Sequence, residues 1–144
     1  MPDVRLAEIS EAPIDHSALV DAVRRPDAGA ISVFLGTVRD NDPQATGTVT
    51  SLSYTCHPSA PSRFGEIVAA VLAEHDPEDG CAVAAVHRIG HLTVGEAAFV
   101  VAVSSGHRAL AMAVCEQVVE HVKAELPIWK QQFEADGSYR WSGL

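Results

Sequence analysis

The feature that most limits the fold of this chain is an amphipathic stretch near its middle. Five apolar residues between Phe64 and Leu72 follow the spacing i, i+3, i+4, i+7 and i+8, which aligns them along one side of an α-helix. Pro77 ends such a helix, because a residue that precedes proline is pushed out of helical geometry. A helix with one apolar side needs an apolar surface to cover it, and the rest of the sequence has to supply that surface.

Runs rich in β-branched and apolar residues predict the strands that form this surface. The stretch "AGAISVFLGTVRD" is nearly all apolar up to Arg39 and Asp40, as in a strand buried on both faces. The stretch "TVTSLSYTC" alternates, with Leu52, Tyr54 and Cys56 on one side, as in a half-buried strand. Two further strands are expected in "CAVAAVHRIG" and "AAFVVAVSS", with "HLTVGEA" as a turn or short strand between them.

Two more helices complete the expected order of elements. A short helix fits "DHSALVDAVRRP", where Asp15 is a candidate N-cap and Pro26 a stop. A second long helix is predicted from Ala109 to Glu125 and ends before Pro127; its buried stripe is Leu110, Val114, Val118 and Val122. This order predicts an α+β fold with mostly antiparallel pairing. A length of 144 residues suits one domain over residues 1–144.

Net charge narrows the classes of function. The formal charge is −9, which disfavours nonspecific binding to nucleic acid or anionic lipid, so any anion has to be bound by a local cluster of cations. The sequence shows no long apolar span and no N-terminal signal pattern, so a cytoplasmic location is expected. Three cysteines without CxxC spacing indicate reduced thiols rather than a disulfide framework or a thiolate zinc site.

One candidate anion site lies where a predicted strand runs into a helix. In "SSGHRALAM" the free N–H groups of a helix N-terminus would lie beside Arg108, whose planar fork suits phosphate or carboxylate. The alternative is that Ser105 caps the helix and Arg108 is a solvated surface charge.

Further cations stand at other element ends. Lys123 ends the same helix, and Lys130 follows Pro127 and Trp129. Trp129 could form an apolar wall that lowers the pKa of a lysine and makes its amine usable in catalysis. Alternatively, Trp129 fills the core, Lys130 points to water and Lys123 pairs with Glu120.

Arg39 has the position of a substrate clamp, at the end of a buried strand and the base of the loop "NDPQATG". Its alternative is an ion pair with Asp40 or Asp42. Cys56 and His57 are a weak thiol–imidazole candidate, because neighbours on a strand point to opposite faces. His87 and His91 lack the helix that would make them a zinc pair, so no metal site is predicted.

Taken together, four segments resemble the large, catalytic subunit of molybdopterin synthase. They are "GAISVFLGTVRDND", "HRIGHLTVGE", "VSSGHRALA" and "VKAELPIWK", in that order, and they extend from Gly29 to Lys130. The resemblance implies an α/β-hammerhead-type fold and a dimer of large subunits, with a small ubiquitin-like subunit bound at each end. It also implies a sulfurtransferase without a cofactor of its own. The small subunit's C-terminal Gly-Gly thiocarboxylate would donate sulfur to cyclic pyranopterin monophosphate, and two transfers would make the molybdopterin dithiolene.

The resemblance also implies roles for particular residues. Lys123 and Lys130 match catalytic lysines, and the substrate-binding set comprises Phe34, Thr37, Val38, Arg39, His107 and Arg108, with Gln131 and Gln132 beside Lys130. The usual Lys-Glu pair after "PIWK" is replaced here by the two glutamines, and "YTCHPSAPSRF" also departs from the family pattern. These departures keep a second hypothesis open, in which a non-catalytic paralogue only binds a ubiquitin-like tail. An unrelated phosphate-ester hydrolase would need a metal site or nucleophile that the sequence does not supply.

Overall fold

The computed structural model describes residues 1–42 and 47–144, and it contains two four-stranded sheets and three helices in those ranges. Most of the loop predicted for residues 41–47 therefore lies outside the described residues. The elements are β1 (Asp3–Ser10), α1 (His16–Ala22), β2 (Ala30–Thr37), β3 (Val49–Cys56), α2 (Ala60–His75), β4 (Ala82–Arg88), β5 (Gly90–Thr93), β6 (Ala97–Ser105), α3 (Arg108–Glu125), β7 (Ile128–Glu134) and β8 (Tyr139–Gly143).

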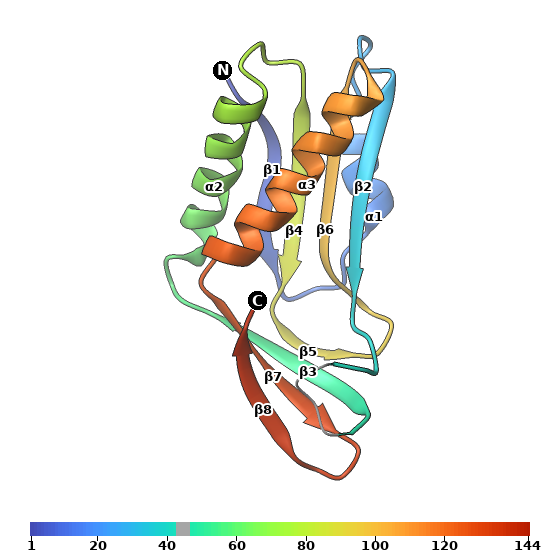
Figure 1. Ribbon diagram of the computed structural model, residues 1–144, viewed down its shortest axis with the longest axis vertical. Coiled ribbons are helices and arrows are strands. Elements are labelled where there is room, and N and C mark those ends of the chain that lie inside the picture. Colours follow the sequence, from blue (N-terminus) through green and yellow to red (C-terminus); the bar gives the residue numbers. More distant parts are fainter. Residues whose placement is uncertain (43–46) are drawn as a thin grey trace.

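The larger layer, called sheet A here, has the order β1-β4-β6-β2, and only the β1–β4 pair is parallel. Helices α2 and α3 lie across one face and α1 lies behind the other (Figure 1). Strand β4 is buried along its whole length, so its two faces contribute to two separate hydrophobic cores. One core holds Val83 and Ala85 against α2 and α3, and the other packs Ala82 and Ala84 against α1.

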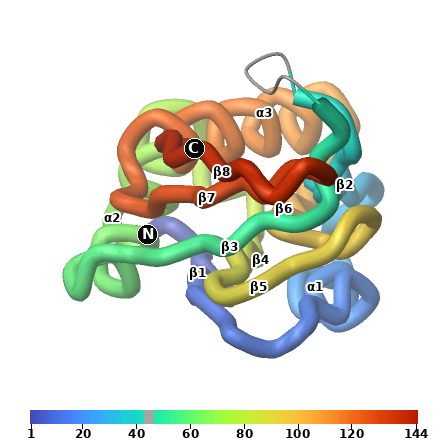
Figure 2. Tube along the Cα trace, turned by 90° about the horizontal axis from the view of Figure 1, so that it is seen from below, coloured from blue at the N-terminus to red at the C-terminus, as the bar shows by residue number. Residues whose placement is uncertain are grey.

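Sheet B has the order β5-β3-β7-β8 and is antiparallel throughout. It closes one end of the molecule, below sheet A in Figure 1, and in the view from below its strands β3, β5, β7 and β8 lie in front of sheet A (Figure 2). The α+β prediction with mostly antiparallel pairing is therefore confirmed. Three strands, β1, β7 and β8, were not predicted. Within the described residues, no helix is both long and apolar enough to cross a membrane.

The helix termini test two expectations about caps. Asp15 is the N-cap of α1, and its carboxylate accepts hydrogen bonds from the N–H groups of Ser17 and Ala18, as predicted. Ser105 does not cap α3, because it is a buried residue at the end of β6. The N-cap is His107, whose side chain makes no capping hydrogen bond within the described part of the chain.

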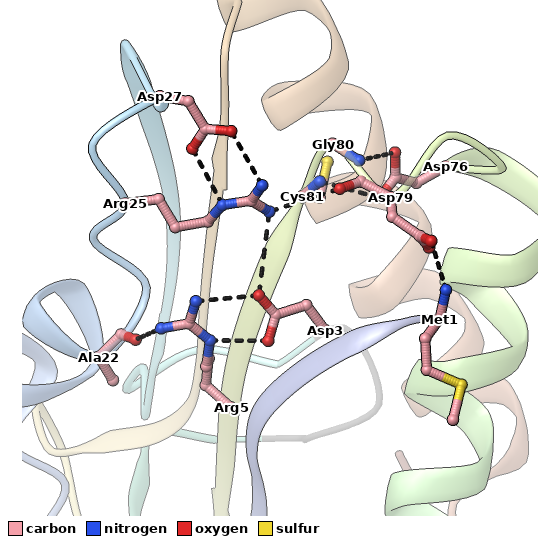
Figure 3. A network of polar contacts seen from close by, with 10 residues as sticks. All are labelled: Met1, Asp3, Arg5, Ala22, Arg25, Asp27, Asp76, Asp79, Gly80 and Cys81. Atoms are coloured by element: carbon pink, nitrogen blue, oxygen red, sulfur yellow. Dashed lines mark hydrogen bonds and ion pairs between the residues drawn. The ribbon is translucent and has the colours of Figure 1, made fainter.

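A chain of polar contacts fixes the N-terminal end of β1 to neighbouring segments (Figure 3). The N-terminal ammonium group pairs with Asp79. Arg5 donates to both carboxylate oxygens of Asp3, at 2.7 and 2.9 Å, and to the carbonyl oxygen of Ala22. Nearby, Arg25 forms a bidentate ion pair with the carboxylate of Asp27. These contacts lie at the opposite end of sheet A from sheet B.

Candidate active site

A pocket of about 200 Å³ lies at the junction of the two sheets. It collects side chains from the end of β2, the last turn of α3, and the inner faces of β3 and β7. Its described lining consists of Thr37, Val38, Arg39, Asp42, Leu52, Tyr54, Lys123, Lys130 and Gln132.

Buried neighbours position the arginine of this pocket. Val38, the first residue after β2, is 4% exposed and packs with Leu52 and Leu92. Its N–H donates to the carbonyl oxygen of Glu96 at 2.9 Å, and its own carbonyl oxygen accepts from Gly95. These two hydrogen bonds fix the backbone at Val38, directly before Arg39. The Arg39 side chain remains exposed at the rim of the pocket. The alternative of an Arg39 ion pair with Asp40 or Asp42 is not seen among the described contacts.

Lys123 reaches the same pocket from the C-terminal turn of α3, next to the fully buried Val122. Partial burial lowers the pKa of the Lys123 amine, and the positive charges of Lys130 and Arg39 lower it further, against an opposing effect of Glu120. The amine is thus more readily deprotonated than that of an ordinary lysine. This is a property expected of a nucleophile or proton acceptor.

Lys130 enters from β7, where alternation sends neighbouring side chains to opposite faces. Its ammonium group lies 3.6 Å from Asp42. The expected apolar wall is absent from the described lining, because Trp129 is on the outer face of the strand and 45% exposed. The pKa of the Lys123 amine is lowered by burial and by neighbouring charge, without an aromatic wall. Pro127 separates α3 from β7, and the lysines on either side of it, Lys123 and Lys130, both line the pocket.

The same alternation separates the two glutamines. Gln132 shares the inner face with Lys130 and is 3% exposed, whereas Gln131 is on the outer face. Sequence reasoning gave Leu52 and Tyr54 no part in the site, although their shared side was recognisable from their alternation, and it considered Asp42 only as an ion-pair partner of Arg39. Burial raises the pKa of Tyr54 to about 12, so its hydroxyl stays protonated and can donate.

Besides Gln131, three residues of the predicted set lie outside the described lining of the pocket. Phe34 packs edge-on against Phe99 in the core beneath α3. His107 and Arg108 are at the opposite end of α3 from Lys123, and at 1.5 Å per residue the separation along the axis is roughly 22 Å. Arg108 instead borders a separate hollow of about 180 Å³, together with Ile31 and Met112.

The charges of the pocket define what it can bind. Its described lining holds three cationic side chains and one carboxylate, so in an otherwise acidic protein it attracts anions. It contains no cysteine: Cys81 and Cys115 are buried in the core, and burial raises the pKa of both thiols. In the described residues no cluster of His, Cys, Asp or Glu could hold a metal ion.

Comparison with known proteins gives a consistent result. The family model described as "MoaE protein" matches residues 9–125. The molybdopterin synthase catalytic subunit of Bacillus subtilis is 38% identical over 138 residues, covering 94% of this chain and 83% of that protein. The corresponding subunit of Aspergillus clavatus is 37% identical over 134 residues, and the match covers 93% of this chain but only 66% of the fungal protein.

Solved structures show the same fold. Molybdopterin synthase from Staphylococcus aureus superposes with a TM-score of 0.84 at 30% identity, covering 95% of this chain and 96% of that chain. The complex of subunits 1 and 2 of the molybdopterin-converting factor from Helicobacter pylori gives a TM-score of 0.68 at 19% identity, covering 96% and 89% of the two chains.

Proposed function

The chain belongs to the MoaE protein family, and from this premise we propose that it is the catalytic, sulfur-transferring subunit of a molybdopterin synthase. The observation that carries the proposal is the convergence of Arg39, Lys123 and Lys130 on one pocket. These residues come from three separate elements, and each is held by buried neighbours. The family match ends at residue 125, yet Lys130, which lies beyond it, completes the pocket. We therefore treat residues 1–144 as one catalytic domain.

The chemistry of the two reactants suits this set of cations. The acceptor, cyclic pyranopterin monophosphate, carries a phosphate, and the donor is a thiocarboxylate. Both are anions, so Arg39 and Lys130 can hold them close together despite their mutual repulsion. Lys123 is the residue suited to accept a proton or attack a carbonyl carbon, because its pKa is lowered. Sulfur arrives with the partner, so no cysteine of this chain takes part.

The donor in this proposal is the C-terminal Gly-Gly tail of a small ubiquitin-like subunit. A two-subunit complex has been solved for the structurally similar converting factor of Helicobacter pylori, which supports a small partner. The pocket is open to solvent at Arg39 and can therefore admit an extended tail.

The distance between Arg108 and Lys123 raises the question of how both could serve one substrate. We propose that two copies of the chain associate through β2, within a heterotetramer that includes two small subunits. Strand β2 is an edge of sheet A and exposes Val33 and Leu35, each 44% accessible. Arg39 follows the C-terminal end of β2. Antiparallel pairing with the β2 of a second copy would place it beside the N-terminal end of that second strand. That end pairs with Ser105, three residues before Arg108.

Reconstitution tests the activity directly. Purified protein mixed with thiocarboxylated small subunit and cyclic pyranopterin monophosphate should yield molybdopterin. Lys123→Ala should abolish product while retaining partner binding, and Cys115→Ala should leave turnover in place. Tight partner binding without any product from the wild-type protein would favour the non-catalytic paralogue instead.

Mixed dimers test the assembly. Arg39→Ala and Arg108→Ala chains should each be inactive alone. If the site is shared between copies, co-expression of the two variants creates dimers with one intact site, and activity returns. If both residues act within one chain, mixing restores nothing, and the proposed arrangement through β2 is wrong.

A further inference from the structure

One polar group of the pocket lining has no hydrogen-bond partner among the described residues. The side chain of Gln132 is buried, with 3% of the residue exposed, and its Nε2 makes no hydrogen bond within the described residues. A buried N–H group normally has an acceptor, because removing it from water without one costs free energy. Gln132 is also among the residues that line the pocket, so a ligand bound there could supply the missing acceptor after a small movement of the side chain.

Strand pairing fixes the backbone that carries this amide. Gln132 lies opposite Leu52 of β3 on one side and Arg140 of β8 on the other. A strand paired along both edges cannot turn or slide without breaking its ladder. The Arg140 guanidinium is engaged with the buried carboxylate of Glu134 at 3.4 Å. The backbone that carries the amide is thus fixed beside the cavity.

The pocket therefore offers two kinds of donor. Arg39, Lys123 and Lys130 are cationic, and Gln132 is neutral. A thiocarboxylate presents two matching acceptors, because its negative charge resides mainly on sulfur while its oxygen stays close to a carbonyl oxygen. A phosphate lacks this asymmetry, and its charged oxygens would be bound preferentially by the three cations.

Resting on the proposed function, we propose that Gln132 donates a hydrogen bond from Nε2 to the terminal oxygen of the partner's tail. This bond selects the orientation in which the sulfur faces the lysines and the acceptor substrate. Gln132 is then a specificity-determining residue that recognises the acyl oxygen, and its contribution does not change with pH because the amide does not titrate.

The substitution Gln132→Met tests this role, because it keeps the length of the side chain and removes the donor. The probes are two synthetic decapeptides with the same sequence, both ending in Gly-Gly, one with a C-terminal carboxylate and one with a thiocarboxylate. Calorimetry should show about tenfold weaker binding of both peptides to the variant, the scale of one hydrogen bond to an anionic group. Gln117→Met on α3, which does not line the pocket, is the matched control and should bind as wild type does.

Thermal unfolding of the free protein separates binding from a structural role. Since the variant removes an unsatisfied buried group, its Tm should be equal to or higher than that of the wild type. A lower Tm in parallel with weaker binding would assign Gln132 to the core and overturn the proposal. In the wild-type protein, the ¹⁵N side-chain amide signals of Gln132 should shift when the carboxylate peptide is added; unchanged signals would also overturn it.

Two further arms complete the test. Inorganic phosphate should bind the wild type and Gln132→Met equally, and a loss confined to phosphate would show that the amide recognises the acceptor substrate instead of the tail. Equal peptide binding by the wild type and Gln132→Met would refute the role of Gln132 but not the proposed function. A wild-type protein that binds neither peptide refutes the proposed function on which this role depends.

Discussion

The buried imidazole of His87 predicts a specific acid sensitivity of the fold. His87 lies on β4, is 2% exposed, and stacks on Phe99 with the edge of Tyr54 against it. Its Nδ1 donates to the carbonyl oxygen of Arg88 at 2.7 Å, which fixes the neutral tautomer. Burial lowers the pKa of His87 to about 4; the Arg88 carbonyl opposes this shift, and the positive charge of Lys123 adds to it.

The size of the effect follows from linkage. In the unfolded chain an ordinary histidine has a pKa near 6.5, so between about pH 6.5 and pH 4 the unfolded state binds a proton that the folded state does not. The contribution of neutral His87 to the stability of the fold is complete above pH 6.5 and is lost as the pH falls toward 4. A difference of roughly 2.5 pKa units at about 1.4 kcal/mol each corresponds to about 3 kcal/mol as an upper limit.

Urea unfolding at a series of pH values from 7.5 to 4 measures this loss. We expect the free energy of unfolding of the wild type to fall by about 3 kcal/mol more than that of His87→Gln over this range. Each protein is compared with itself, so the cost of the substitution cancels. His16→Gln, at an exposed histidine, should follow the wild-type curve. Parallel curves for wild type and His87→Gln would refute the linkage reasoning.

Three further substitutions test other parts of the structure. Asp15→Ala removes the N-cap acceptor of α1 and should lower the free energy of unfolding by about 1 kcal/mol in urea titrations. Asp76→Ala leaves the N–H groups of Gly80 and Cys81 without their acceptor and should cost about 3 kcal/mol in the same assay, since the first bond is partly buried and the second fully buried. Lys123→Met should raise the Tm at pH 7, because the folded state disfavours the charged amine; the gain should vanish above about pH 10.5, where the unfolded chain also loses the proton.

The helices and the central strands could be predicted because burial imposes a period on them. The stripe from Phe64 to Leu72 lies in the core beside sheet A, as expected. Arg39 and Lys123 were recognised as site candidates because each ends an element whose buried face was evident. For such residues, local pattern and position along the chain are sufficient.

The missed strands depend on contacts that no local pattern contains. Strand β1 mixes polar and apolar residues and carries an irregularity between Val4 and Leu6, so its alternation is weak. Strand β7 turns polar side chains, Lys130 and Gln132, toward the inside of the protein, which reverses the usual rule that inner faces are apolar. The distance between Arg108 and Lys123, by contrast, follows from the length of α3, because they lie near its two ends; the predicted helix already implied it.

The parallel pairing of β1 with β4 has a consequence for how the protein is made. Asp3 pairs with Ala82, which lies 79 residues further along the chain. At a synthesis rate of roughly 5 to 20 residues per second, the first strand emerges about 4 to 16 s before its partner exists. During that interval its apolar side chains have no sheet to join. The N-terminal segment of the nascent chain is therefore the part most dependent on protection by the cell while the ribosome completes sheet A.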